Sequence, residues 1–173
     1  MTVQGDPITA LRDELRRSLH GPAWHGPALL EALHDISPRE AQAHPLAGTQ
    51  SIAELAFHAL AWVEEVTRRL GGATPSLPAR GDWPTDDTAL PVVESVRLLR
   101  RAGDTLDRML ATFPSARLSD IVGGPVHDAP TGSGVTYGVM LHGLAQHNAY
   151  HGGQIALLKK ALRDSSAEAF TTA

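Results

Sequence analysis

Apolar residues recur at helical spacing in several stretches of this chain, and proline, glycine and capping residues separate the stretches. The first stretch begins at Asp6-Pro7, a capping acid followed by a proline in the first helical turn, and it stops at Gly21-Pro22. Residues 24–27 form an irregular joint, after which a short helical piece ends near Ser37-Pro38. We therefore expect a broken first helix with apolar positions at Ile8, Leu11, Leu15, Leu19, Leu29, Leu30 and Leu33.

The second helix is the most clearly marked element of the sequence. Residues Ser51 to Glu54 form a capping box, in which the two side chains bond the free backbone amides of the first turn. A periodic apolar run follows the box and stops at Gly71-Gly72. The inward positions of this helix are Leu55, Ala59, Trp62, Val63, Val66 and Leu70.

Two further helices are expected in the second half of the chain. The third runs from about Pro91 to Phe113, where Pro114 ends it, and Gly103 weakens it slightly. Its inward positions are Val92, Val96, Leu99, Leu106, Met109 and Leu110. The fourth helix begins near Thr136 and carries one stripe made of Leu144, Asn148, His151, Ile155, Leu158 and Leu162.

Residues 71–90, between the second and third helices, have the proline and glycine content of a loop. Fully extended, such a segment reaches roughly 60 Å, about twice the length of a twenty-residue helix. The third helix can therefore run parallel to the second. No stretch alternates with period two over enough residues to form a sheet, so the amphipathic helices must bury their stripes on one another. We expect an all-α protein with a single domain over residues 1–173.

Composition narrows the chemistry that this chain can perform. It contains no cysteine, so any metal must bind to nitrogen or oxygen, and no thiol nucleophile is present. The net charge of −4 and the few scattered aromatic residues argue against a nucleic-acid partner. The first twenty residues hold no unbroken apolar run, so we expect no signal peptide, no membrane association and a cytoplasmic location. The nine histidines are the compositional feature that points to chemistry.

Two of these histidines share one side of the fourth helix. His147 and His151 differ by about 40° around the helix axis and about 6 Å along it, so both imidazoles can reach one ion. This spacing also fits two separately solvated histidines. His58 lies in the middle of the second helix and supplies a third nitrogen ligand if the second and fourth helices are neighbours.

Three segments of the chain resemble the DinB/YfiT-like superfamily of bacterial metalloproteins. They are the run QHNAYHGGQI at 146–155, the run ELAFHALAW at 54–62 and the run WHGP at 24–27, and the likeness covers nearly the whole chain. The resemblance implies a four-helix bundle of up-down-down-up topology, with a long crossover loop between helices two and three, that forms a homodimer. It also implies a three-histidine metal site, whose ligand positions correspond to His58, His147 and His151.

An open site of three neutral imidazoles leaves the charge of a divalent ion uncompensated, and such an ion lowers the pKa of water or a thiol bound to it. Relatives in the superfamily include transferases and isomerases that use low-molecular-weight thiols. We therefore expect a metal-dependent thiol S-transferase or a hydrolase acting on a small-molecule substrate. A non-catalytic metal-binding or small-molecule-sensing dimeric module is the alternative, and a bundle whose main property is dimerisation is a third. Imidazole suits several metals, among which we favour zinc or nickel.

Further residues are candidates for the surroundings of the metal. Those proposed for a substrate pocket are Trp24, His25, Trp62, Tyr150 and Gln154. Tyr150 and Gln154 either orient a ligand or pack against a neighbouring helix. Glu54 could accept the second ring proton of His58, but we assign it to the capping box, and we assign no catalytic base. His142 is placed in the outer surroundings of the site or at the surface, and the histidines assigned to surface or loop are His20, His34, His44 and His127.

Overall fold

The structure is a computed structural model that describes residues 5–124, 128 and 131–171. Within these residues the regular elements are helices, and the only β-type contacts are isolated bridges. The helices are α1 (Pro7–His20), α2 (Leu29–Ala32), α3 (Pro38–Gln42), α4 (Ile52–Leu70), α5 (Val92–Leu110), the 3-10 helix η1 (Ser115–Ser119) and α6 (Tyr137–Thr171). The prediction of an all-helical fold is therefore confirmed for the described part of the chain.

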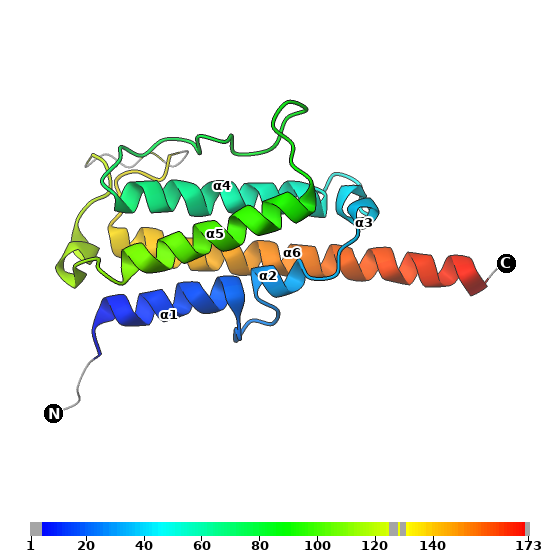
Figure 1. The fold of residues 1–173 in the computed structure, drawn as a ribbon, viewed down its shortest axis with the longest axis horizontal. Coiled ribbons are helices and arrows are strands. Elements are labelled where there is room, and N and C mark those ends of the chain that lie inside the picture. Colours follow the sequence, from blue (N-terminus) through cyan, green and yellow to red (C-terminus); the bar gives the residue numbers. More distant parts are fainter. Residues whose placement is uncertain (1–4, 125–127, 129–130, 172–173) are drawn as a thin grey trace.

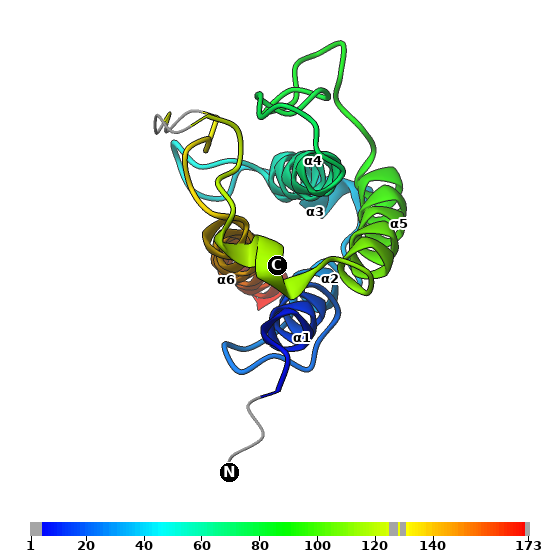
Figure 2. The same ribbon diagram turned by 90° about the vertical axis from the view of Figure 1, so that its left-hand side faces the viewer.

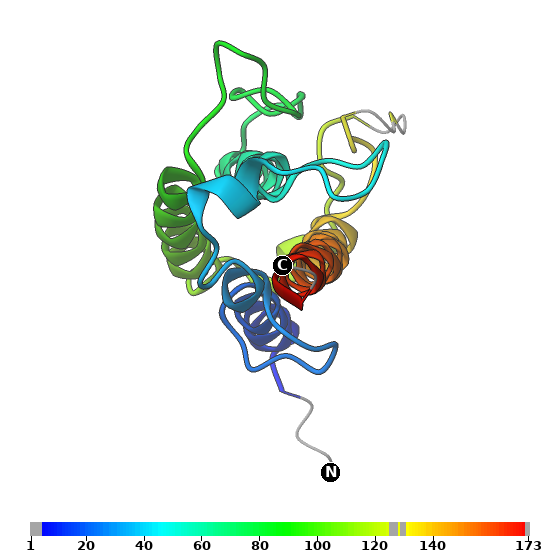
Figure 3. The same ribbon diagram turned by 90° about the vertical axis from the view of Figure 1, so that its right-hand side faces the viewer.

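The long helices α1, α4, α5 and α6 surround a shared interior when the molecule is seen end-on in Figure 2. Helix α4 packs against both α5 and α6, and α1 packs against the same two helices. The interior is apolar, and Leu99, Leu141 and Ile155 are among its fully buried side chains. The short helix α3 contacts α4 and α5, and it lies across the N-terminal end of α4 in Figure 3.

Residues 71–91 follow the outside of α4 back along its length before α5 begins (Figure 1). This route brings Asp82 beside His58 in the middle of α4. Helix α6 is the longest element, and its C-terminal part extends beyond the other helices in Figure 1. The loop and α6 thus both reach α4 at the level of His58.

Side-chain caps are present at three of the predicted helix starts. Asp6 accepts a hydrogen bond from the backbone amide of Ile8 at the start of α1. The capping box of α4 is present, since Ser51 accepts from the Glu54 amide and Glu54 accepts from the Ser51 amide. At the start of α6 the Thr136 hydroxyl accepts a hydrogen bond from the Val139 amide. Each of these bonds is local in sequence, which is why the starts were predictable.

Two predicted helix ends are wrong. Ser37-Pro38 does not end a helix but begins α3, because Ser37 and Glu40 form a capping box and Pro38 occupies the first turn. Helix α5 ends at Leu110, three residues before Phe113, and a short turn reaches Pro114. A proline therefore sets the position beyond which a helix cannot continue, but the helix can end several residues earlier.

Gly103 has a different role from the slight weakening of α5 that the sequence suggested. A Cβ atom at this position would lie 2.3 Å from Leu19 Cδ2 and 3.2 Å from His20 Nε2. The glycine therefore leaves room for the buried Leu19 side chain of α1, and a larger residue requires that side chain or α1 to move. Among the described residues, none of the helices combines the length and the hydropathy needed to cross a membrane.

Candidate metal centre

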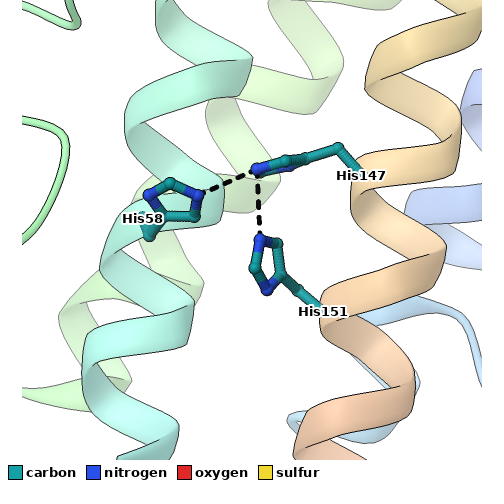
Figure 4. Close-up of side chains that lie close together, drawn as sticks. All are labelled: His58, His147 and His151. Carbon is teal, nitrogen blue, oxygen red and sulfur yellow. Dashed lines mark hydrogen bonds between the residues drawn. The ribbon is translucent and has the colours of Figure 1, made fainter. Parts of the chain in front are cut away.

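Three histidine side chains from two helices converge between α4 and α6 (Figure 4). His58 comes from the middle of α4, where nearly every neighbouring residue is buried. His147 and His151 are one turn apart on α6 and point towards α4. His58 and His151 are buried and His147 is half-buried. The sequence prediction that helices two and four bring these side chains together therefore holds for the described chain.

The Nε2 atom of His147 lies close to the Nε2 atoms of both other rings. The Nε2 atoms of His58 and His147 are 2.9 Å apart, and those of His147 and His151 are 3.2 Å apart. The three candidate donor atoms all lie within 4.8 Å of one another. Imidazole nitrogens that bind one zinc ion at about 2.0–2.1 Å are roughly 2.9–3.4 Å apart in octahedral or tetrahedral geometry. Two of the three separations match this range and the third is within 4.8 Å, so the group is compatible with binding a divalent ion.

The outer nitrogen of His58 is bonded to the loop that follows α4. Nδ1 donates to the backbone carbonyl oxygen of Asp82 at 2.8 Å, and the Asp82 carboxylate lies 3.1 Å away. The same carboxylate accepts a hydrogen bond from Trp62 Nε1 at 2.8 Å. A proton fixed on Nδ1 leaves the Nε2 lone pair directed at the other two histidines. Asp82 therefore orients both His58 and Trp62.

The other two rings are held differently. His151 Nδ1 donates to Gln154 Oε1 at 2.6 Å, which again leaves Nε2 as the inward donor atom. His147 Nδ1 is buried and has no hydrogen-bond partner among the described residues. Burial, with the nearby His151 and His58, lowers the pKa of His147 to about 3. Burial also lowers the pKa of His151. Both rings are neutral at physiological pH, which is the form that binds metal.

The residues predicted for a substrate pocket occupy different positions. Trp24 is fully exposed and His25 is also exposed, and neither ring takes part in the ring contacts described around the three histidines. Tyr150 is exposed, with its ring 5.1 Å from the ring of His151. Trp62 is half-buried, and its ring lies 6.3 Å from the ring of His147. The pocket assignment of these residues stays a prediction.

The other histidines that the structure describes lie apart from the three-histidine centre. His142, His34 and His44 each lie beside an acidic residue, at Glu14, Asp35 and Glu54 respectively. Glu54 caps α4 as predicted and contacts His44, not His58. His20 is partly buried against α5, where burial lowers its pKa. His127 lies outside the described residues.

Sequence reasoning missed two residues of the site, Asp82 and Trp83. Trp83 stacks on His58, with ring centroids 4.0 Å apart and planes 5° from parallel. Both residues lie in the segment 71–91, which the sequence identified only as a loop. An acid and a tryptophan adjacent to each other in a proline- and glycine-rich loop were the available signal, because a large apolar ring in a loop needs a surface to cover.

The fold and the site define a class of protein: a helical bundle with a three-histidine candidate metal centre between two of its helices. The sequence model of the DinB superfamily matches residues 23–155, which include all three histidines, and the chain belongs to this superfamily. No curated protein matches the chain in sequence. No solved structure matches it either.

Proposed function

We propose that this protein is a metal-dependent enzyme that holds a divalent ion, zinc or nickel, through His58, His147 and His151. The observation that carries the proposal is the convergence of three Nε2 atoms, two of them on rings whose Nδ1 protons are bonded to Asp82 and Gln154. Three protein ligands leave at least one coordination position for water or substrate, which distinguishes a catalytic from a structural site. When bound, the ion supplies Lewis-acid chemistry that lowers the pKa of water or of a thiol.

The chain's own residues orient the ligands and limit the access of water. Asp82 and Gln154 hold the imidazoles of His58 and His151 in the required tautomers. Trp83 covers one face of His58. The Asp82 carboxylate already accepts from Trp62 and lies beside His58, so we give it a positioning role and not that of a general base.

The reaction class that we propose is thiol S-transfer or hydrolysis, with a low-molecular-weight thiol or a small molecule as substrate. The absence of cysteine supports the thiol reaction, because no thiolate of the protein competes for the ion. In cobalt-loaded protein, a sulfur-to-cobalt absorption band on addition of a thiol favours transfer, whereas turnover of an activated ester without such a band favours hydrolysis. A loaded protein that does neither favours the alternative of a non-catalytic sensing module.

The finer arrangement belongs to the same proposal: a four-helix bundle in which α1, α4, α5 and α6 follow the up-down-down-up order, assembled as a homodimer. Two observations support the parallel course of α4 and α5. Residues 71–91 run back along α4 (Figure 1), and a Cβ on Gly71, at the end of α4, would lie 3.7 Å from Met109 Cε near the end of α5. Light scattering coupled to size-exclusion chromatography tests the dimer.

The metal site is tested by elemental analysis of untagged protein, because a histidine tag would itself bind nickel. We expect close to one ion per chain in the unaltered protein and its loss in the variants His58→Ala and His151→Ala. The matched control is His142→Ala, which removes a histidine of the same helix that lies beside Glu14, and it keeps the metal. Retention of metal in both ligand variants, or none in the unaltered protein after loading, would contradict the proposal.

A further inference from the structure

A pocket of about 240 Å³ lies between α4 and α6, next to the three-histidine centre. His147 and Trp62 line it on the side of the candidate metal, and Arg69 and Gly132 also line it. Apolar side chains form most of the remaining wall, among them Val66, Val135, Met140 and Leu144. The volume lies below the range of pockets for drug-sized ligands, so the pocket suits a small molecule with an apolar body.

The charged residue of this pocket is an arginine with a side chain that is almost entirely buried. Arg69 is 2% exposed. Its Nε donates to Glu65 Oε1 at 2.7 Å and its Nη2 donates to the backbone oxygen of Ser76 at 2.9 Å. No hydrogen bond from Nη1 is found within the described residues. A Cβ on Gly132 would lie 3.3 Å from Nη1, so a side chain at this position would crowd Nη1, and both residues line the pocket.

The positive charge at this end of the pocket is only partly neutralised. The Glu65 carboxylate bonds both Arg68 and Arg69, so two guanidinium groups share one buried carboxylate. No acidic residue lines the pocket itself in the described part of the chain. A buried cation without a full counter-charge is costly, and an anionic ligand group would complete the pairing.

We propose that this pocket binds a small apolar carboxylate, with its carboxylate on Arg69 Nη1 and its other end at His147. The Arg69 guanidinium carbon lies 5.6 Å from the centroid of the Trp62 ring, and this ring lies 6.3 Å from the ring of His147, so Trp62 links the cation to the three-histidine centre. The volume of the pocket suits a molecule of about the size of phenylpropionate. The placement of the ligand's other end at His147 rests on the proposed function, because it puts the reacting group beside the ion. Pairing of the carboxylate with Arg69 requires no metal.

The test compares phenylpropionate with its neutral amide by isothermal titration calorimetry on metal-free protein. Phenylacetate and phenylbutyrate extend the series in length. We expect the best acid to bind at least about tenfold more tightly than its amide, because a carboxylate forms a charge-assisted hydrogen bond with the guanidinium. Equal affinity for acid and amide, or no binding of any acid of the series, overturns the proposal.

Variants of two glycines on α6 locate the ligand without altering Arg69. Gly143 lines the pocket, and a Cβ there meets nothing within 4 Å, so Gly143→Leu places a side chain in that space. Gly153 is equally open but does not line the pocket, and Gly153→Leu is the matched control. We expect Gly143→Leu to weaken acid binding at least about tenfold and the control to leave it unchanged. Unchanged binding in Gly143→Leu overturns the proposal.

A third variant tests the cation itself. Arg69→Gln, with its fold checked by circular dichroism, should lose the preference for acid over amide, and a retained preference overturns the assignment. Elemental analysis of the unaltered protein after zinc loading reports the metal independently. If the metal-free protein fails to bind the acids but the loaded protein holds zinc, only the pocket assignment is removed. If the metal-free protein binds the acids but the loaded protein holds no zinc, only the proposed metal function is removed.

Discussion

Trp83 stacks face to face on His58, with the two ring centroids 4.0 Å apart. The residue before it, Asp82, accepts the hydrogen bond from His58 Nδ1. Two adjacent loop residues therefore cover one face of a candidate ligand and fix its tautomer. The loop after α4 is part of the site as much as the helices that supply the imidazoles.

This stacking predicts that Trp83 reports metal binding through its fluorescence. Cobalt at the three-histidine site should quench tryptophan emission, because the indole lies against the ring of a ligand. Trp83→Phe should remove a large share of the quenching, while Trp24→Phe, at a fully exposed position, should leave it unchanged. Equal quenching in the two variants would show that cobalt binds elsewhere.

Gln154 should contribute to metal affinity although it is not a ligand. Its Oε1 accepts the hydrogen bond that orients His151, and the loss of such a partner weakens metal binding roughly 10- to 100-fold. Gln154→Leu should therefore release metal to a competing chelator at a concentration lower by about that factor. Gln146→Leu, at an exposed position of the same helix, provides the control. Unchanged affinity in Gln154→Leu would mean that helix packing alone orients His151.

Gly103→Ala should destabilise the protein, although alanine usually stabilises a helix interior. The new methyl group would meet Leu19 Cδ2 at 2.3 Å, and relief of this contact should make the net cost about 1 kcal/mol in urea unfolding. Gly153→Ala meets no neighbouring atom and should instead stabilise by roughly 0.5–1 kcal/mol. Stabilisation by both substitutions would show that Leu19 is not held firmly against Gly103 and yields to a methyl group.

The buried ion pair of Glu65 and Arg69 predicts a loss of stability in acid. Burial alone would raise the pKa of Glu65, but hydrogen bonds from Arg68, Arg69 and the Ser76 amide outweigh it, and the pKa lies below its ordinary value. The stabilisation is therefore complete above the unfolded-state pKa of about 4.3 and is lost as pH falls through the lower folded-state pKa.

Glu65→Gln separates this contribution from those of the other carboxylates. On metal-free protein at pH 7, the substitution should lower the free energy of unfolding by about 3 kcal/mol, because it leaves buried Arg69 without its counter-charge. The difference between the variant and the unaltered protein should narrow below pH 4.3 or so. A difference that stays constant down to pH 3 would show that the charge on Glu65 does not contribute.

Local signals in the sequence account for the helix starts and for the histidine pair on α6. Capping residues act within one helical turn, and the spacing of His147 and His151 is fixed by the helix itself. The position of His58 beside them required the packing of α4 against α6, which the resemblance to a family supplied. The three histidines are thus the part of the candidate site that could be predicted.

The surroundings of the ligands could not be predicted in the same way. Asp82 and Trp83 reach His58 only because the loop returns along α4, and no local pattern specifies that route. Arg69 lies near the C-terminal end of α4, where a cation is ordinarily solvated and interacts favourably with the helix dipole. Packing instead buries Arg69 beside Glu65. Tertiary contacts, and not the local pattern, determine these positions.

The most direct test of the metal centre is anomalous diffraction from crystals of the untagged protein loaded with zinc. The account predicts a single strong peak about 2.1 Å from the Nε2 atoms of His58, His147 and His151. A peak at other residues, or none between these three nitrogens at full zinc loading, would contradict it.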